Sequence, residues 1–262
     1  MMKTPRQIVP SLLLGCLLLL GCKTHTDTHV AVEVSNDPSE DYPNPERFEN
    51  AIKKFEAADA ENMPPDNAVL CIGSSSMRMW RDHLEKDLAP LTVIGRGFGG
   101  SNTNDVLHYA DRIIIPYQPR AIVIYEGDND VAQGISPEEI AATYAKLLDK
   151  IDTELPDCRV YILAVKPSIK RWSMWPTMQR VNALLAELAR ERDGVTYIDI
   201  ATPMLNDAGE PRPDLFIEDD LHMNRKGYEV WRDTIRPILV DTEKQYERQR
   251  VGWVELCDTH RE

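Results

Sequence analysis

The sequence predicts a three-layer α/β/α domain built on a five-stranded parallel sheet, and three observations support that fold class. Five short runs of aliphatic, β-branched and aromatic residues are almost continuously apolar, as strands buried on both faces must be. Longer stretches with helical periodicity alternate with these runs, which is the pattern of βαβ units. The length of 262 residues fits one α/β domain of ordinary size.

The first 21 residues have the pattern of an export signal. Two cations in "MMKTPRQ" precede an apolar run of about 14 residues, which is shorter than the roughly 20 that a membrane-spanning helix needs. Leu19-Leu20-Gly21-Cys22 resembles a bacterial lipobox, which implies a lipid anchor on Cys22. Cys16 fits the same pattern after a shorter apolar run, and an ordinary cleaved signal is the alternative. Lys23 after the cysteine favours the outer membrane of the cell envelope, with the protein facing the periplasm.

The chain that follows the signal divides into a tether, a folded domain and a tail. Residues 22–44 are polar and lack periodicity, so we expect a flexible tether. The folded domain is predicted to span residues 45–248, and a tail to span 249–262. Cys71, Cys158 and Cys257 remain outside the signal, and an odd number of cysteines at wide spacing specifies no disulfide framework.

The expected strands and helices alternate along the middle of the chain. The strands are "AVLCIG" from Ala68, "LTVIG" from Leu91, "AIVIYEG" from Ala121, "RVYILAV" from Arg159 and "VTYIDIA" from Val195. The clearest helix begins after Ser136, whose side chain is suited to capping a helix N-terminus. Another, "MQRVNALLAELARERDG", ends at Gly194, a predicted C-cap. A last helix is expected from about Asn224 to Arg248.

The charge of the chain narrows the class of partner. The net charge is −13 and the pI is near 5.0. Binding to nucleic-acid phosphates needs a basic surface, so we expect no nucleic-acid partner. The membrane contact that we expect is the N-terminal lipid anchor.

Polar and glycine-rich motifs follow the predicted strands. "GSSS" comes after the first strand, "RGFGGSNTND" after the second and "GDND" after the third, while "EDDLH" comes after the fifth. In an open parallel sheet, ligands bind at the carboxyl ends of the strands. We therefore expect a serine, a glycine-rich turn, an asparagine and a histidine to meet at one edge of the sheet.

Each motif alone has a simpler explanation. A serine-rich turn can cap a helix, glycines can permit a tight backbone, and an asparagine can stabilise a turn. The glycines lack the Gly-Lys-Ser/Thr signature of a phosphate-binding loop, and "EDD" has no second histidine nearby, so we predict no metal and no cofactor. Trp80, Trp172 and Trp175 either line a pocket for an acyl or sugar group or serve as ordinary packing residues.

Taken together and in this order, the motifs resemble the sequence blocks of the SGNH (GDSL) hydrolase superfamily. "IGSSSMRMW" stands where the family has Gly-Asp-Ser, "GRGFGGSNTNDVL" where it has a glycine, "GDND" where it has Gly-x-Asn-Asp, and "DDLH" where it has Asp-x-x-His. The segment "AVKPSIKRWSMWPTMQRVNALL" is similar to one in the branch with Gly-Ser-Ser-Ser, which is similar to bacterial relatives of platelet-activating-factor acetylhydrolase. The resemblance covers the chain from Val69 to Trp231 and implies a flavodoxin-like fold.

The resemblance implies that Ser75 is the nucleophile of a catalytic triad. Ser74 then occupies the position of the family's aspartate, which is not part of the triad, and Ser76 is expected to cap the helix that follows. A serine hydroxyl is a poor nucleophile at neutral pH and needs an adjacent base.

The base and its orienting acid are implied in "EDDLH". His222 can take the proton of the serine hydroxyl, and Asp219, three residues earlier, can hold the ring and stabilise the imidazolium that forms. Asp220 is the competing candidate for the orienting acid, and the spacing of the family favours Asp219.

Attack on an ester also builds negative charge on the carbonyl oxygen, which needs preorganised donors. The candidates are the backbone N–H groups of Ser75 and Gly100 and the side-chain amide of Asn129, with Gly99 as the alternative if the register shifts by one.

The resemblance implies a serine esterase that acts on a small-molecule, lipid or carbohydrate ester, such as an acetylated carbohydrate or a lysophospholipid. One alternative is a non-catalytic envelope lipoprotein that binds a glycan or lipid in the same cleft, and another is an acyltransferase that uses the same triad. The complete set of serine, glycine, asparagine, aspartate and histidine favours the enzyme, because a binding module needs no such set.

Overall fold

The structure is a computed structural model that describes residues 42–258. The predicted signal, the lipidation of Cys22, most of the tether and the last residues of the tail lie outside the described residues. Within residues 42–258, no helix combines the length and the apolar character needed to cross a bilayer.

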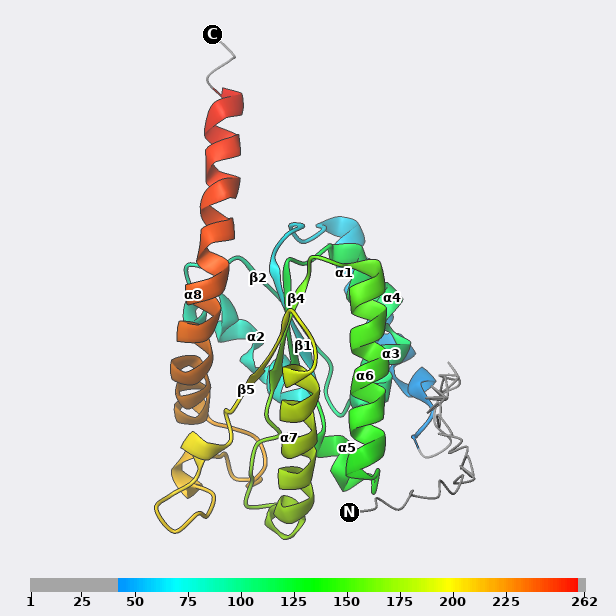
Figure 1. Ribbon diagram of the computed structural model, residues 1–262, viewed down its shortest axis with the longest axis vertical. Helices are drawn as coiled ribbons and strands as arrows, with labels where there is room; N and C mark the ends of the chain where they lie inside the picture. The colour runs from blue at the N-terminus through cyan, green and yellow to red at the C-terminus, as the bar shows by residue number, and fades with distance from the viewer. Residues whose placement is uncertain (1–41, 259–262) are drawn as a thin grey trace, which may run out of the picture. The chain divides into compact units, whose positions relative to one another are not determined.

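The five predicted strands form one parallel sheet in the order β2-β1-β3-β4-β5 (Figure 1). Their bounds are Val69–Gly73 for β1, Val93–Gly97 for β2, Ala121–Tyr125 for β3, Arg159–Leu163 for β4 and Val195–Ile198 for β5. Every residue of β1 and β3 is buried, whereas the edge strands β2 and β5 are only partly buried. The continuous apolar runs therefore mark the middle of the sheet, and the predicted fold class is confirmed.

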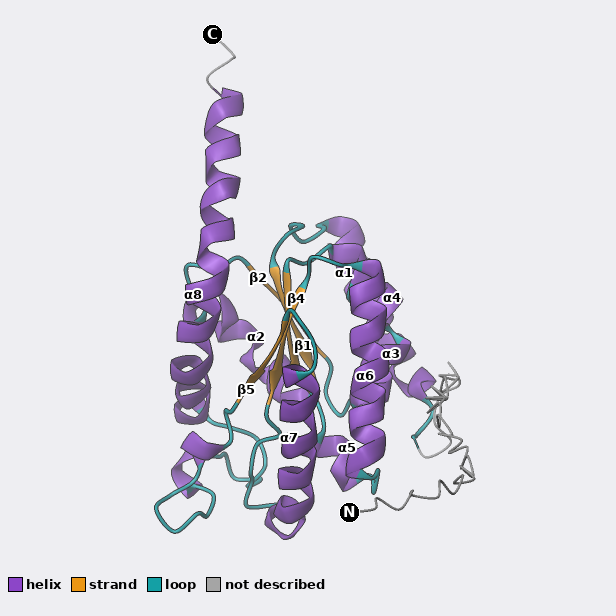
Figure 2. Cartoon of the chain, in the orientation of Figure 1, coloured by secondary structure: helices purple, strands orange, loops and turns teal. Residues whose placement is uncertain are grey.

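Helices cover both faces of the sheet (Figures 1 and 2). The α-helices are α1 (Glu49–Glu61), α2 (Ser75–Asp87), α3 (Thr103–His108), α4 (Ala110–Ile113), α5 (Asp128–Ala132), α6 (Pro137–Glu154), α7 (Trp175–Arg190) and α8 (Arg225–Asp258). Short 3₁₀ helices are η1 (Pro45–Phe48), η2 (Ile115–Tyr117), η3 (Trp172–Met174), η4 (Thr202–Met204) and η5 (Pro213–Leu215). In Figure 1, α2 and α8 lie on one side of the sheet, and α6 and α7 lie on the other together with α3 and α4. The observed architecture is the predicted three-layer sandwich.

Several predicted element boundaries differ from the observed ones. Ser136 caps α6 as expected, with its Oγ accepting the N–H of Glu139 at 3.2 Å. Gly194 is not the C-cap of α7, because the helix ends at Arg190 and Gly194, with φ of +75°, instead forms the turn before β5. Helix α8 continues to Asp258, past the expected end at 248.

The chain joins the domain slightly earlier than expected. Tyr42 falls within the predicted tether, yet it is buried and its hydroxyl donates to Asp130 Oδ1 at 3.0 Å. Helix α1, which follows, was not predicted as an element. Its Glu49 and Glu56 both pair with Arg112 of α4 and hold it against the domain.

Trp80 is part of the hydrophobic core and does not line a pocket. Its side chain is fully buried between α2 and α8, its indole N–H donates to Asp87 Oδ2 at 2.8 Å, and its ring meets Trp231 edge-on at 5.7 Å. The packing interpretation of this residue is therefore the correct one.

Candidate active site

The candidate site lies where the strand order reverses, between the carboxyl ends of β1 and β3. The chain leaves β1 on one face of the sheet for β2, and later crossovers run on the other face; in open parallel sheets, ligands bind at such a point. Gly73 ends β1 with φ of +147°, and a Cβ there would lie 2.2 Å from the carbonyl oxygen of Tyr125. Only glycine allows β1 to turn here so close to β3.

Ser75 is the first residue of α2, directly after that turn. It is partly exposed, and its hydroxyl oxygen lies 2.8 Å from His222 Nε2. The other ring nitrogen, Nδ1, lies 2.5 Å from Asp219 Oδ2. A carboxylate can only accept, so Asp219 selects the tautomer with the proton on Nδ1 and leaves Nε2 free to accept from the serine hydroxyl. The structure thus brings together three predicted residues that are up to 147 positions apart.

Asp219 is held in its charged form. Desolvation by itself would raise the pKa of Asp219, but hydrogen bonds from the His222 ring and from the N–H groups of His222 and Leu221 outweigh it and lower the pKa to about 2. Asp220 instead has φ of +59°, and its carbonyl accepts the N–H of Lys170 at 2.9 Å. The geometry therefore brings Asp219, and not Asp220, to the histidine.

The loop that carries the acid and the base is closed by short-range hydrogen bonds. Phe216 and Met223 form an antiparallel bridge, and the N–H of Ile217 donates to the carbonyl of His222 at 2.9 Å. Asn224 then links the loop to α8, because its Nδ2 donates to the carbonyl of Phe216 while its Oδ1 accepts the N–H of Lys226. The side chains of Asp219 and His222 are 43% and 22% exposed, so a substrate can reach them.

The backbone N–H groups of Ser75 and Gly100 have no acceptor among the described residues. Ser75 is at the N-terminus of α2, where the first-turn N–H groups have no intrahelical acceptor and the helix dipole favours negative charge. Gly100 has φ of +89° in the turn after β2, and among residues 42–258 its N–H has no acceptor. Gly99 lacks a positive φ. A Cβ built on Gly100 would meet only the ring of Phe48, at 3.9 Å, so its conformation rather than the space requires glycine.

Asn129 lies in the first turn of α5, directly after β3. Its Nδ2 donates to the carbonyl of Ser101 at 2.8 Å, and its Oδ1 accepts from Arg171 Nη2 at 2.9 Å. Arg171 also donates through Nη1 to the carbonyl of Asp128 at 2.9 Å. Sequence reasoning missed Arg171, since no local pattern pairs it with a residue 42 positions earlier.

Buried carboxylic acids lie beneath these turns and were also missed. Glu126 is fully buried and accepts from the hydroxyl of Ser101 at 2.5 Å. Asp130 accepts the N–H groups of Thr103 and Gly127, each at 3.0 Å. Burial raises the pKa of Glu126 well above its ordinary value and also raises that of Asp130. Their hydrogen bonds connect the turn after β2 to the turn after β3. The high polarity of "EGDND" was the available signal.

The two serines beside Ser75 have different surroundings. Ser74 is buried, and its hydroxyl has no hydrogen-bond partner among the described residues. Ser76 does not cap α2 as expected, because the helix already begins at Ser75. Its carbonyl instead accepts the hydroxyl of Tyr228 at 2.9 Å, which ties α2 to α8.

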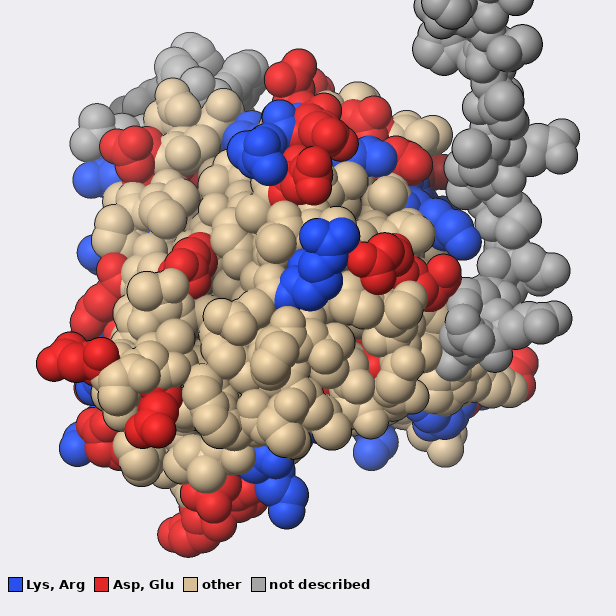
Figure 3. All heavy atoms as spheres, turned by 60° about the horizontal axis from the view of Figure 1, so that its bottom comes forward, with Lys and Arg blue, Asp and Glu red and all other residues tan. Residues whose placement is uncertain are grey.

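Trp172 and Trp175 follow Arg171 in the sequence, and Arg171 contacts Asn129 of the candidate site. Their rings stack with centroids 5.9 Å apart, and Trp172 is only partly buried. Figure 3 turns the carboxyl edge of the sheet forward and shows that uncharged side chains cover much of this face.

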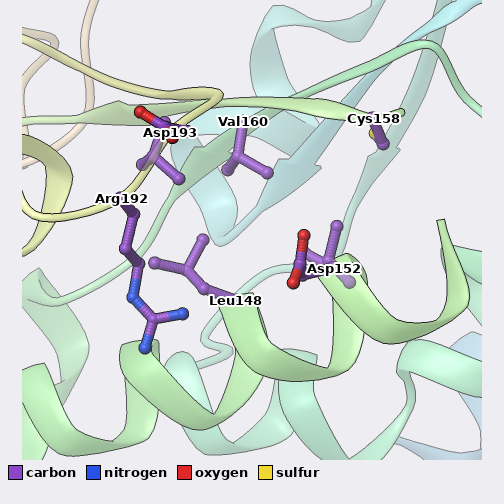
Figure 4. Close-up of a pocket in the computed structure, with 8 residues that line it drawn as sticks. Leu148, Asp152, Cys158, Val160, Arg192 and Asp193 are labelled. Atoms are coloured by element: carbon purple, nitrogen blue, oxygen red, sulfur yellow. The ribbon is translucent and has the colours of Figure 1, made fainter. Parts of the chain in front are cut away.

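A separate cavity lies at the opposite ends of the strands (Figure 4). Its volume is about 220 Å³, and its lining includes Cys158 and Val160 of β4 and Val195 of β5. Burial raises the pKa of the Cys158 thiol to about 12, so the thiol stays protonated at neutral pH. This cavity contains none of the predicted site residues.

The sequence profile of the GDSL-like Lipase/Acylhydrolase family matches residues 71–230. The chain belongs to this family. The match contains Ser75, Gly100, Asn129, Asp219 and His222, and the resemblance predicted from the sequence blocks is confirmed. As a member of the GDSL-like lipase/acylhydrolase family, the protein is an ester-hydrolysing enzyme. No curated protein matches the chain in sequence.

Several solved structures, a lipase and an esterase among them, share the fold of the chain. A Streptococcus pneumoniae protein provisionally named a platelet activating factor is 19% identical, with a TM-score of 0.66, over 73% of this chain and 92% of that one. A GDSL-like lipase from Bacteroides thetaiotaomicron is also 19% identical, with a TM-score of 0.62, over 72% of this chain and 97% of that one. An acetyl-xylooligosaccharide esterase from Geobacillus is 15% identical, with a TM-score of 0.54, over 65% and 93% of the two chains. At these identities the likeness establishes the fold.

Proposed function

We propose that the protein is a serine esterase that cleaves a small acyl ester through an acyl-enzyme on Ser75. The observation that carries the proposal is the hydrogen-bonded series from Ser75 through His222 to Asp219, with separations of 2.8 Å and 2.5 Å. A nucleophile next to a base, and a base oriented by a fixed acid, are what nucleophilic acyl transfer requires.

In the first half-reaction, Ser75 Oγ attacks the ester carbonyl carbon while His222 Nε2 takes the hydroxyl proton. Asp219 remains ionised and stabilises the imidazolium. The negative charge that develops on the carbonyl oxygen is met by the N–H groups of Ser75 and Gly100 and by the Asn129 amide. The bond to the alcohol oxygen then breaks, and His222 returns its proton to the leaving alcohol.

In the second half-reaction, water attacks the acyl-enzyme and gives its proton to His222. The carboxylic acid leaves, and the proton returns to Ser75 Oγ. A sugar hydroxyl in place of water would give acyl transfer with the same groups, so the fate of the acyl group depends on which acceptor the site admits.

We favour a neutral ester of a carbohydrate or lipid, such as an acetylated carbohydrate or a lysophospholipid. The largely uncharged surface around the carboxyl edge of the sheet in Figure 3 supports a neutral substrate. The structural likeness to an acetyl-xylooligosaccharide esterase supports an acetylated sugar.

We also propose that the enzyme acts in the bacterial envelope, anchored through a lipid on Cys22. The support is the apolar signal and the lipobox-like sequence that ends at Cys22. Metabolic labelling of the full chain with a radioactive fatty acid should mark the wild type and not Cys22→Ala. Equal labelling of the Cys16→Ala variant and the wild type would fit Cys22, whereas loss of label in Cys16→Ala alone would move the anchor to Cys16.

The esterase proposal is tested by turnover of a chromogenic ester series from acetyl to long acyl chains. We expect highest kcat/KM with short chains and a loss of at least about 10⁴-fold in Ser75→Ala. Ser74→Ala is the matched control, because the Ser74 hydroxyl has no partner to lose, and its turnover should stay within about threefold of the wild type.

A serine-directed phosphonate gives a second measurement that does not depend on the choice of ester. It should label the wild type and Ser74→Ala at one site and leave Ser75→Ala unlabelled. If the wild type cleaves no ester and takes no label, the glycan- or lipid-binding alternative replaces the esterase. If activity survives in Ser75→Ala, the nucleophile is another residue.

A further inference from the structure

The guanidinium of Arg171 contacts two successive residues of the turn after β3. Nη2 donates to the side-chain carbonyl of Asn129 at 2.9 Å, and Nη1 donates to the backbone carbonyl of Asp128 at 2.9 Å. The same Nη1 lies 3.2 Å from Asp128 Oδ1, and the arginine side chain is only 16% exposed. We propose that Arg171 is a positioning residue that fixes and polarises the Asn129 amide for the oxyanion, an inference that relies on the proposed esterase function.

The first part of this role is to fix the orientation of an amide that could otherwise be turned around. An asparagine amide has nearly the same shape after a flip that exchanges oxygen and nitrogen, but only its NH₂ end can stabilise an oxyanion. Arg171 has donors only, so it selects Oδ1, and the carbonyl of Ser101 can only accept, so it selects Nδ2. Together the two neighbours permit one orientation, and it leaves one N–H of Nδ2 for the substrate.

The second part of the role is electrostatic. A cation hydrogen-bonded to the amide oxygen draws electron density from the nitrogen and makes its N–H a stronger donor, as in other charge-assisted hydrogen bonds. The effect grows as negative charge develops on the substrate oxygen, so it favours the transition state over the bound ester.

The surroundings hold the guanidinium in place. The Asp128 side chain is 7% exposed and lies between Arg171 and the ammonium of Lys166, which is 3.6 Å from Asp128 Oδ2. Lys166 is 1% exposed and donates to the carbonyl of Leu221 at 2.9 Å, within the loop of the acid and the base. The segment after β4 therefore connects the loop of His222 to the turn of Asn129.

A double-mutant cycle tests whether Arg171 acts through Asn129. In the full chain, Arg171→Met should lower kcat by about 10- to 30-fold and change KM by less than about threefold, because the lost interaction belongs to the transition state. In the Asn129→Ala background, the same substitution should change kcat by less than about threefold, since the amide that Arg171 positions is gone. Phosphonylation rates of Ser75, measured on the same four proteins, should follow the same pattern.

Two further variants test whether the loss in Arg171→Met comes from misplacing the Asn129 amide, from a damaged fold or from the loss of a positive charge near the site. Arg171→Lys keeps the cation but cannot hold both carbonyls in the geometry of the fork, so it should recover only part of kcat, and that partial loss should also vanish with Asn129→Ala. If Arg171→Met proves unstable in thermal melts, Arg171→Lys takes its place in the double-mutant cycle. Lys170→Met removes an exposed neighbouring cation whose backbone N–H bonds to Asp220, and it should stay within about twofold of the wild type.

The possible failures are distinguishable. Wild-type kcat in Arg171→Met, or losses that multiply in the double variant, would overturn the role of Arg171 and leave the esterase intact. Wild-type turnover in Asn129→Ala, with Ser75→Ala inactive, would instead remove Asn129 from the oxyanion site and the inference with it.

Discussion

Two groups of carboxylic acids lie at the carboxyl edge of the sheet, and their surroundings have opposite effects on their charge. Asp219 is 43% exposed, and hydrogen bonds from its own loop lower its pKa to about 2 in spite of the opposing effect of desolvation. Glu126 and Asp130 are fully buried beneath the turns after β2 and β3, and burial raises the pKa of each. The hydrogen bonds of the exposed loop favour the charged form of its acid, whereas burial in the turns disfavours the charged form of the other two.

In the proposed mechanism the two halves of the site have different roles, and this difference in electrostatics suits each role. Proton transfer through His222 needs a fixed negative partner, which the loop of Asp219 supplies with three hydrogen bonds. Binding an oxyanion needs oriented dipoles, and buried acceptors can hold such dipoles in place. Glu126 accepts from the hydroxyl of Ser101, and the carbonyl of Ser101 in turn accepts from Asn129 Nδ2.

Asp219→Asn should give the largest change and tests the charged half. We expect kcat to fall by about 10³-fold, because the amide no longer stabilises the imidazolium and can favour the wrong tautomer. Asp220→Asn is the matched control, since asparagine tolerates the φ of +59° at that position, and its kcat should stay within about threefold of the wild type. Steady-state kinetics on a short-chain ester measures kcat of both variants. A large loss in Asp220→Asn with little loss in Asp219→Asn would assign the orienting acid to Asp220.

Gly100→Ala should have an intermediate effect and tests the geometry of the other half. The φ of +89° disfavours any side chain, so the turn must shift, and we expect kcat to fall by about 10- to 100-fold with a loss of about 1–2 kcal/mol in the free energy of unfolding. Gly99→Ala would place its Cβ 2.8 Å from the flexible Arg78 side chain, which can move, so its effect should be within about threefold. A larger effect at Gly99 would mean that its N–H is the oxyanion donor.

Asp105→Asn should have the smallest effect on activity, and it tests the effect of burial on a carboxylic acid through the pH dependence of stability. Asp105 lies in the first turn of α3, the helix that follows β2, and its carboxylate is 2.5 Å from the guanidinium of Arg47. Burial raises the pKa of Asp105 to about 7. A carboxyl whose pKa is higher in the folded state stabilises the fold most below its ordinary pKa of 3.8, and this contribution is lost as pH rises through about 7.

We therefore expect the free energy of unfolding of the wild type to decline between about pH 4 and 7. The decline should be shallower in Asp105→Asn, by at most about 1.4 kcal/mol per pH unit. Urea titrations at several pH values measure it, and Asp149→Asn, at an exposed pair with Arg192, is the control. An unchanged slope in Asp105→Asn would show that Asp105 is already ionised in the folded protein at low pH.

Local patterns in the sequence were sufficient for the sheet and for the positions of the site residues. Short, largely apolar runs predicted all five strands, because a sheet covered by helices on both faces favours apolar residues in its strands. Asp219 and His222 lie three positions apart on one loop, so their contact depends on local backbone alone. Predictions of caps were less successful, since whether Gly194 or Ser76 ends or begins a helix depends on the packing of the turn.

The sequence by itself thus determined the fold class, the family and the set of residues at the carboxyl edge. Only the tertiary structure decided which neighbours those residues meet: Trp80 with Trp231 in the core, Glu126 with Ser101, and Arg171 with Asn129 from a position 42 residues away. The physical reason is one of range. Periodicity and turn chemistry act over a few residues, whereas these contacts are set by the strand order and by the crossovers that bring separate loops to one edge of the sheet.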